Sequence, residues 1–202
     1  MPDYSNIIMT IADALADQGY CILDQVLSDE VNLALLAHYK SLDQAQFKLA
    51  GIGRASQHQQ NQQIRSDHII WQEQDNPILA PYFDWVEQLR LGLNRYLYLG
   101  LFDYECHYAY YPAGAFYRKH IDAFKAQRNR MVTTILYLNP DWMPDAGGEL
   151  IMYQPDNSGV LVRVEPVFGR VVVFLSEQFP HEVATTQQER YSLTGWYRVN
   201  QG

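Results

Sequence analysis

The C-terminal half of the sequence contains three residues whose types and spacing could bind a metal ion. His120 and Asp122 are separated by one residue within FYRKHIDAF, which is otherwise aromatic, apolar and basic. If this stretch is a β-strand, both side chains project from the same face. His181 follows RVVVFL, whose continuous apolar character predicts a buried strand. Two histidines and one carboxylate can form a facial triad that holds Fe(II) and leaves coordination positions open.

A histidine and an aspartate at this spacing recur by chance, and an isolated histidine on a strand is usually a structural residue. The stretch ERYSLTGWYR adds a second observation, because a strand there would place Arg190, Thr194 and Trp196 on one face. A guanidinium beside a metal can bind the far carboxylate of a dicarboxylate whose other end chelates the metal. The alternative is that Arg190 is an ordinary surface arginine.

The N-terminal half has the apolar periodicity of amphipathic helices. The predicted helices run from Tyr4 to about Gln18 before Gly19, from the N-cap Ser28 to roughly Leu49, and over residues 77–98. Between the second and third helices, residues 51–63 are mostly glycine, glutamine and small polar residues. Such residues bury little surface to offset the entropy of ordering, so we expect a mobile loop over residues 51–66. It is either a disordered surface segment or a lid that orders over a site.

From Tyr104 onward the sequence changes to short β-rich runs separated by turn signals such as NPDW, AGGE and QPDNSG. The runs are YECHYAYY, FYRKHIDAF, RMVTTILYLN, GELIMY, LVRVEP, RVVVFL, HEVAT and RYSLTGWYRV. Many short strands in succession imply a β-sandwich, a barrel or a jelly roll, with the helices packed on the outer face of one sheet. We expect a single domain over residues 1–202, in which 1–100 are mainly helical support and 101–202 form the catalytic core.

Composition limits the classes of function. The chain of 202 residues is 48% hydrophobic, and no apolar run approaches the roughly 20 residues that cross a bilayer. The N-terminus lacks the features of a signal peptide, and Cys21 and Cys106 match no metal or redox spacing, so we expect a cytoplasmic protein. The formal net charge of -8 argues against a nucleic-acid partner.

Several stretches together carry a resemblance to a known family. They are IRSDHIIW, YYPAGAFYRKHID, ILYLNPDW, GGEL, VEPVFGRVVVFLSEQFPHEV and RYSLTGWY. The region from about Ile64 to Val199 resembles the Fe(II)- and 2-oxoglutarate-dependent prolyl hydroxylases related to the enzymes that modify hypoxia-inducible factor, and it looks closest to their bacterial branch. This resemblance implies an α+β fold with a double-stranded β-helix core, which is a cupin-like jelly roll. It also implies Fe(II), 2-oxoglutarate and O2, with ascorbate as a candidate accessory cofactor.

The resemblance also implies a role for individual residues. It assigns iron binding to His120, Asp122 and His181, and the pairing with the C5 carboxylate of 2-oxoglutarate to Arg190. It implies that Tyr137 and Thr194 form hydrogen bonds to that carboxylate and that Tyr111 and Tyr117 lie near the metal. It further implies that Arg130 and Trp196 line the prolyl pocket, and that Arg65 and Asp67 form a pair at the base of the substrate-covering loop. Each tyrosine could instead be a core aromatic residue with a satisfied hydroxyl.

The implied reaction is hydroxylation of a prolyl residue in a protein, with release of succinate and carbon dioxide. The bacterial relatives suggest elongation factor Tu, an acidic protein that a basic rim at Arg118, Lys119 and Arg128 would suit. The animal members have a glycine-rich turn one residue longer than PAGAFY and a covering loop richer in charge than GIGRASQHQQNQQ, which leaves the substrate of this chain open.

Other functions stay open at this point. The enzyme class could be right and the substrate a free amino acid, a small metabolite or an alkylated base, although the acidity of the chain counts against the base. The same residues could also form a non-catalytic cupin-like module that senses a metal or 2-oxoglutarate. A zinc hydrolase is less well supported, since no glutamate stands at hydrolase spacing from the ligands.

Overall fold

The computed structural model describes residues 2–50, 63–122 and 129–200. Its elements in chain order are α1 (Ser5–Asp17), β1 (Tyr20–Leu23), α2 (Asp29–Ser41), a 3-10 turn (Gln44–Gln46), β2 (Lys48–Leu49), β3 (His68–Gln72), α3 (Ala80–Leu97), β4 (Leu101–Tyr111), β5 (Tyr117–His120), β6 (Arg130–Tyr137), β7 (Leu150–Tyr153), β8 (Val160–Val164), β9 (Val171–Leu175), β10 (His181–Val183) and β11 (Arg190–Val199).

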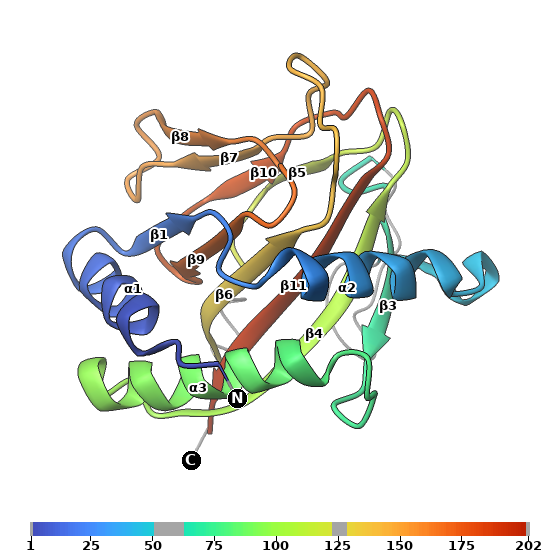
Figure 1. Cartoon of the computed structure of the whole chain (residues 1–202). Helices are drawn as coiled ribbons and strands as arrows, with labels where there is room; N and C mark the ends of the chain where they lie inside the picture. The colour runs from blue at the N-terminus through green and yellow to red at the C-terminus, as the bar shows by residue number, and fades with distance from the viewer. Residues whose placement is uncertain (1, 51–62, 123–128, 201–202) are drawn as a thin grey trace.

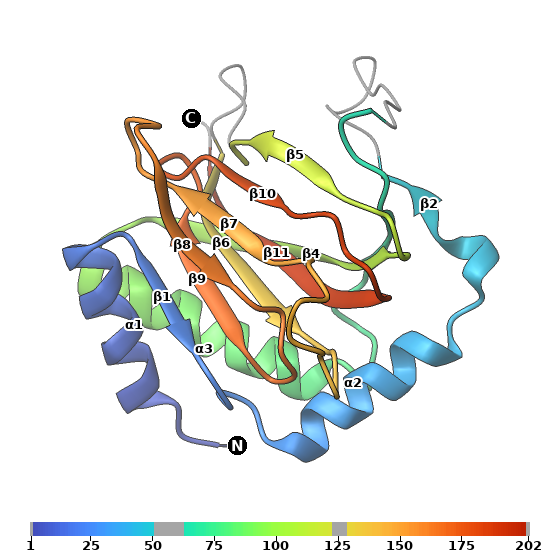
Figure 2. The ribbon, with the colours of Figure 1, turned by 90° about the horizontal axis from the view of Figure 1, so that it is seen from above.

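Two antiparallel sheets form the core of the fold. The larger sheet has the order β1-β9-β6-β11-β4-β3-β2, and the smaller sheet has the order β5-β10-β7-β8. The smaller sheet covers one face of the larger sheet, and the three helices cover the other face (Figures 1 and 2). The predicted α+β fold with a jelly-roll core and helices on one sheet is confirmed. A strand occurs in each predicted run of the C-terminal half, but within FYRKHIDAF it is limited to Tyr117–His120.

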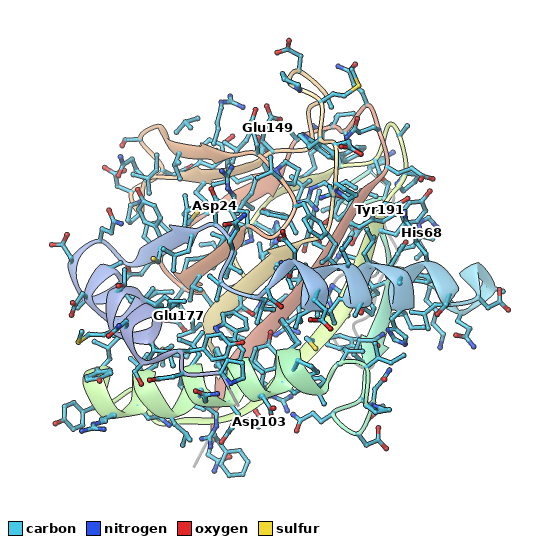
Figure 3. All side chains as sticks on the ribbon, viewed as in Figure 1. Asp24, His68, Asp103, Glu149, Glu177 and Tyr191 are labelled. Atoms are coloured by element: carbon cyan, nitrogen blue, oxygen red, sulfur yellow. The ribbon has the colours of Figure 1, made fainter. Side chains whose placement is uncertain are left out.

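Strand β11 shows how the larger sheet separates its two faces. Leu193 and Tyr197 belong to the core beneath the helices, and the Tyr197 hydroxyl donates a hydrogen bond of 2.6 Å to the Val86 carbonyl of α3. Because side chains alternate along a strand, Arg190 and Trp196 point to the opposite face, toward the smaller sheet. Both are buried there. In Figure 3, Asp103 and Tyr191 mark the opposite ends of the β4–β11 pair.

The helices differ from the expected ones mainly at their ends. In α1 the apolar stripe of Ile8, Ile11 and Leu15 is buried, as its periodicity predicts, and the helix packs beside α3. Ser28 caps α2 by accepting a hydrogen bond from the Val31 amide. However, α2 ends at Ser41 and does not extend to Leu49.

The early end of α2 has a local cause. Leu42 adopts an extended conformation, and the Asp43 carboxylate then accepts a hydrogen bond of 2.9 Å from the Ala45 amide. Aspartate favours such turns because its side chain competes for nearby backbone amides. The chain continues through the 3-10 turn into β2, which pairs with β3. Neither of these strands was among the runs expected from alternation.

The expected mobile loop over residues 51–66 lies largely outside the described residues. Its described end is hydrogen-bonded to the region of β5: the Ser66 amide donates to the Phe116 carbonyl, and the Arg118 amide donates to the Ile64 carbonyl. The described part of the expected loop is therefore joined to the sheet. Among the described helices, none is both long and apolar enough to cross a membrane.

A substitution at Gly195 in β11 tests how tightly the larger sheet is packed on the face that the helices cover. A Cβ at this position would lie 2.1 Å from the Tyr104 hydroxyl oxygen. That hydroxyl is hydrogen-bonded to the hydroxyls of Tyr82, at 2.5 Å, and Thr134, at 2.6 Å. Gly195→Ala should therefore lower the free energy of unfolding by about 1–3 kcal/mol, measured by urea denaturation.

Gly159→Ala is the matched control, since no heavy atom lies within 4 Å of a Cβ there. We expect this control to change the free energy of unfolding by less than about 0.5 kcal/mol. Equal stabilities of the two variants would contradict the close packing of Tyr104 on β11.

Candidate metal centre and cosubstrate site

His120, Asp122 and His181 come together at one end of the smaller sheet. His120 ends β5 and His181 begins β10, and the two residues are direct partners in the antiparallel ladder. Asp122 Oδ1 lies 3.5 Å from His120 Nε2, and Asp122 Oδ2 lies 3.7 Å from His181 Nε2. The candidate ligand atoms of all three residues lie within 4.8 Å of one another. This spacing suits a single metal ion bound by two imidazoles and one carboxylate.

The local structure around Asp122 differs from the one expected. The sequence suggested a strand carrying His120 and Asp122 on one face, but β5 ends at His120 and Asp122 lies in the bend that follows. Its position is fixed by Thr133 of β6, whose hydroxyl donates a hydrogen bond of 2.8 Å to Asp122 Oδ2. The Thr133 hydroxyl is also 2.8 Å from that of Ser176. Sequence reasoning missed Thr133, because only the pairing of distant strands reveals this contact.

Backbone contacts orient both imidazole rings. His120 Nδ1 lies 2.9 Å from the Arg118 carbonyl, and His181 Nδ1 lies 2.9 Å from the Phe179 carbonyl. A carbonyl accepts only, so each Nδ1 carries a proton, and Nε2 of each ring is the nitrogen on the side of Asp122 that can bind a metal. This arrangement is how metal-binding histidines are commonly held.

The protonation states of the triad also suit a metal. Burial opposes ionisation of Asp122, but His181 and His120 together hold the pKa of its carboxyl well below the usual range. Burial, with a contribution from His120, lowers the pKa of His181 to about 4. Near neutral pH the site therefore presents a carboxylate and a neutral His181 imidazole, which are the forms that bind metal ions.

Arg190 supplies the strongest indication that the site also binds an anion. Its side chain is only 1% exposed, and Nε donates a hydrogen bond of 2.8 Å to the Gly148 carbonyl. Within residues 2–50, 63–122 and 129–200, no carboxylate forms an ion pair with this guanidinium. A buried charge without a counterion costs several kcal/mol, which a bound carboxylate would offset.

Two tyrosines border the Arg190 guanidinium. Its Cζ lies 4.8 Å from the ring centroid of Tyr111 and 5.0 Å from that of Tyr137. The Tyr137 hydroxyl is buried, and no described residue makes a hydrogen bond of ordinary geometry with it. Burial raises the pKa of Tyr137, although the Arg190 charge opposes this shift, so the phenol stays protonated and can donate to an anion. Thr194 is partly buried on the same face of β11.

Tyr117, Arg65 and Asp67 lie together beside the triad. The Tyr117 ring stacks on His120 with 3.6 Å between centroids, and the Arg65 guanidinium lies 4.1 Å from the Tyr117 centroid. Arg65 donates two hydrogen bonds, of 2.8 and 2.6 Å, to the fully buried Asp67 carboxylate. Arg65 and Asp67 therefore form a bidentate ion pair that holds the guanidinium against the Tyr117 ring beside the site.

Arg130 and Trp196 meet at the other end of this face. The Arg130 guanidinium lies 3.7 Å from the Trp196 ring centroid, and Arg130 Nε and Nη2 both donate to Glu105 Oε1. Glu105 Oε2 accepts a further hydrogen bond of 2.9 Å from Arg198. Glu105 and Arg198 were not predicted, because their role depends on the register of β4, β11 and β6.

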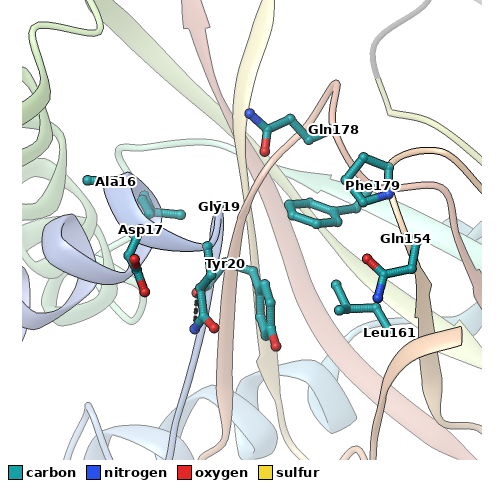
Figure 4. Close-up of a pocket in the computed structure, with 11 residues that line it drawn as sticks. Ala16, Asp17, Gly19, Tyr20, Gln154, Leu161, Gln178 and Phe179 are labelled. Atoms are coloured by element: carbon teal, nitrogen blue, oxygen red, sulfur yellow. Dashed lines mark hydrogen bonds between the residues drawn. The ribbon is translucent and has the colours of Figure 1, made fainter.

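The hollow in Figure 4 is lined by a different set of residues. It has a volume of about 380 Å³ and is formed by the end of α1, the start of β1, the turn before β10 and the β7–β8 hairpin. Its lining residues are Leu15, Ala16, Asp17, Gln18, Gly19, Tyr20, Gln154, Pro155, Leu161, Gln178 and Phe179. It includes no member of the triad and not Arg190, so it is not the candidate site.

Comparison with known proteins identifies the family. The model of the 2OG-Fe(II) oxygenase superfamily matches residues 106–198. The solved structure of a Pseudomonas putida prolyl-4-hydroxylase is 39% identical, covers 96% of this chain and 100% of its own, and superposes with a TM-score of 0.86. The chain belongs to the prolyl hydroxylases of the 2OG-Fe(II) oxygenase superfamily.

Other members of the family are more distant. A prolyl hydroxylase from Trichoplax adhaerens, solved in complex with a hypoxia inducible factor oxygen degradation domain peptide fragment, is 28% identical over 96% of this chain and 90% of its own, with a TM-score of 0.81. Human prolyl hydroxylase EGLN3 is 28% identical over 93% of this chain and 81% of its own length. The chain spans only 48% and 45% of the mouse and human Egl nine homolog 1 proteins that it also matches.

Thr133→Val tests the support of Asp122 by the Thr133 hydroxyl. The substitution keeps the shape of the side chain and removes the hydroxyl that donates to Asp122 Oδ2. We expect about a 10- to 100-fold weaker affinity for Mn(II), a redox-stable stand-in for Fe(II), measured by calorimetry. Thr185→Val on an exposed residue is the control and should bind Mn(II) like the unmodified protein. Equal affinities of the two variants would contradict a role for Thr133 in orienting the carboxylate.

Proposed function

We propose that this protein is an Fe(II)- and 2-oxoglutarate-dependent oxygenase that hydroxylates a prolyl residue of a protein and releases succinate and carbon dioxide. The observation that carries this proposal is the buried Arg190 guanidinium, which has no carboxylate partner among the described residues. Arg190 lies on the face of the larger sheet that is directed toward the smaller sheet, which carries the two histidines of the triad. A metal site alone would fit many functions. A metal site combined with a buried cation that lacks a counterion fits a dicarboxylate cosubstrate.

His120, Asp122 and His181 would hold the metal on one side and leave its other side open. With Fe(II) and O2 bound, the centre would supply oxidative decarboxylation of 2-oxoglutarate coupled to hydroxylation of a C–H bond. The protein itself would keep both imidazoles in the tautomer that offers Nε2 and would keep Asp122 ionised. Thr133 would prevent the carboxylate from rotating away.

The far carboxylate of 2-oxoglutarate would take the place of the counterion that Arg190 lacks. Arg190 Nε is committed to Gly148, which fixes the plane of the guanidinium and leaves its remaining N–H groups to donate to the cosubstrate. Tyr137 would donate its hydroxyl proton to the same carboxylate, and Thr194 would add a hydrogen bond from β11. Tyr111 would form an apolar side of the cosubstrate site.

The substrate would enter over the aromatic part of the site. We propose that Tyr117, Arg130 and Trp196 border the prolyl residue, and that Arg65 and Asp67 hold the base of the covering segment. Most of residues 51–66, for which we expect a lid, lies outside the described chain. The peptide bound to the Trichoplax adhaerens relative supports a protein substrate for this family.

Elongation factor Tu stays our candidate substrate. Arg118 and Lys119 are exposed residues of β5, and a basic rim there would favour an acidic partner. Arg128, the third residue of the expected rim, lies outside the described residues. We also propose a cytoplasmic location, which is expected from the composition of the sequence, and a supporting role for ascorbate, which the family resemblance implies.

Mass spectrometry tests the reaction directly. Elongation factor Tu and a host lysate are each incubated with the protein, Fe(II) and 2-oxoglutarate, and tryptic peptides are searched for oxygen insertion on proline. We expect insertion that requires 2-oxoglutarate, is matched by succinate release and is lost with Asp122→Ala. Succinate without any modified proline would instead favour a small-molecule substrate, and binding of 2-oxoglutarate without succinate would favour a sensor.

Arg190→Ala tests the cosubstrate site separately from the metal. Loss of a charge-assisted pair in a buried site costs about 2–5 kcal/mol, so the apparent affinity for 2-oxoglutarate should fall at least about 30-fold. Mn(II) binding should change little, because Arg190 is no part of the triad. Arg163→Ala, which removes an exposed arginine of β8, is the control and should behave like the unmodified protein. Unchanged 2-oxoglutarate affinity in Arg190→Ala would refute the assignment.

A further inference from the structure

His107 lies on the candidate site's face of the larger sheet. In β4 it pairs with Thr194 of β11 on one side and with Trp71 of β3 on the other. Residues directly opposite in antiparallel strands project to the same face, so His107 faces the smaller sheet together with Thr194 and Trp196. Its side chain is only 4% exposed.

His107 Nδ1 is fully buried and has no hydrogen-bond partner among the described residues. The nearest rings belong to Trp71, with 4.9 Å between centroids, and Trp196, with 5.2 Å. Trp196 Nε1 is likewise buried and has no partner among the described residues. Buried polar groups are nearly always hydrogen-bonded, so two adjacent exceptions at one site indicate contacts that a ligand supplies.

The surroundings of His107 keep the imidazole neutral. Burial lowers the pKa of His107 well below its usual range, and the charges of Arg65 and Arg130 act in the same direction, while Asp122 acts against them. A neutral imidazole offers one N–H donor and one acceptor. Its partner can therefore be a neutral polar group and need not be an anion.

The chemistry of a prolyl substrate determines whether His107 uses its N–H donor or its acceptor nitrogen. A prolyl residue has an apolar ring and no backbone N–H, so carbonyl oxygens are the polar atoms nearest to it. A residue that recognises this segment must therefore donate. We propose that His107 is a substrate-binding residue that donates a hydrogen bond to a backbone carbonyl at the target proline, beside the Trp196 ring. This inference rests on the proposed prolyl hydroxylation.

Two variants separate hydrogen bonding from packing. His107→Phe keeps an aromatic ring and removes the donor, while His107→Asn keeps an N–H donor near the position of Nδ1. The control is His38→Phe on α2, because the ring nitrogens of His38 contact the Tyr108 hydroxyl and the Asn76 amide on the helical side of the sheet. The probe is a library of acetylated, amidated pentapeptides with a central proline and mixed flanking residues, scored for oxygen insertion by mass spectrometry.

We expect His107→Phe to lower kcat/KM for the library about tenfold, chiefly through KM, since a hydrogen bond in a buried site contributes on the order of a tenfold change in affinity. The KM for 2-oxoglutarate and the affinity for Mn(II) should stay within about twofold of the unmodified protein. His107→Asn should recover part of the loss. His38→Phe should change the melting temperature without changing the KM for the library.

Three results would overturn the inference. An unchanged KM for the library in His107→Phe would exclude the contact, and an equal loss for library, 2-oxoglutarate and Mn(II) that follows the melting temperature would assign a purely structural role. A raised KM for 2-oxoglutarate alone would place the contact on the cosubstrate. Failure of the proposed function has a different signature: the unmodified protein would bind Mn(II) and 2-oxoglutarate and modify no peptide of the library.

Discussion

The antiparallel contact between β5 and β10 sets His181 directly opposite His120, and the rest of the candidate site is arranged around this pair. Cross-strand partners have Cβ atoms about 4.5–5.5 Å apart, which brings two imidazoles close enough to share one ion. Asp122 then needs only to turn back from the end of β5, and the carbonyls of Arg118 and Phe179 set the tautomers. A shift of one residue in this ladder would turn one histidine away from the other.

The two faces of the larger sheet serve different purposes. The face toward the helices is apolar and buries its few hydroxyls in internal hydrogen bonds, such as the one from Tyr197 to Val86. The face toward the smaller sheet carries buried polar groups that the described chain leaves without partners, namely the Tyr137 hydroxyl, His107 Nδ1 and Trp196 Nε1. Arg190 and Trp196 lie six residues apart on β11, roughly 20 Å at about 3.3 Å per residue. One strand can therefore serve a cosubstrate at one end and a protein segment at the other.

Features set by local sequence could be predicted, whereas those set by the pairing of distant strands could not. The short strands of the C-terminal half could be predicted from periodicity and turn signals, and the spacing of the triad residues suggested a metal site that the family resemblance then assigned to them. Asp122 was expected on a strand, but β5 ends before it and Thr133 of β6 holds it. The partnership of Glu105 with Arg130 and Arg198 depends on strand register, which no local pattern encodes. The end of α2 at Ser41 reflects turn chemistry at Asp43 that competed with an otherwise helical pattern.

The central claim is that the triad and Arg190 form one site, in which metal and 2-oxoglutarate bind together. Calorimetric titration of 2-oxoglutarate into the protein, with Mn(II) present and again after the metal is removed by a chelator, tests this coupling most directly. Our account predicts binding of one 2-oxoglutarate per chain that is at least about tenfold tighter with the metal than without it. Equal affinity under the two conditions would mean that the organic acid does not reach the triad, and would contradict the account.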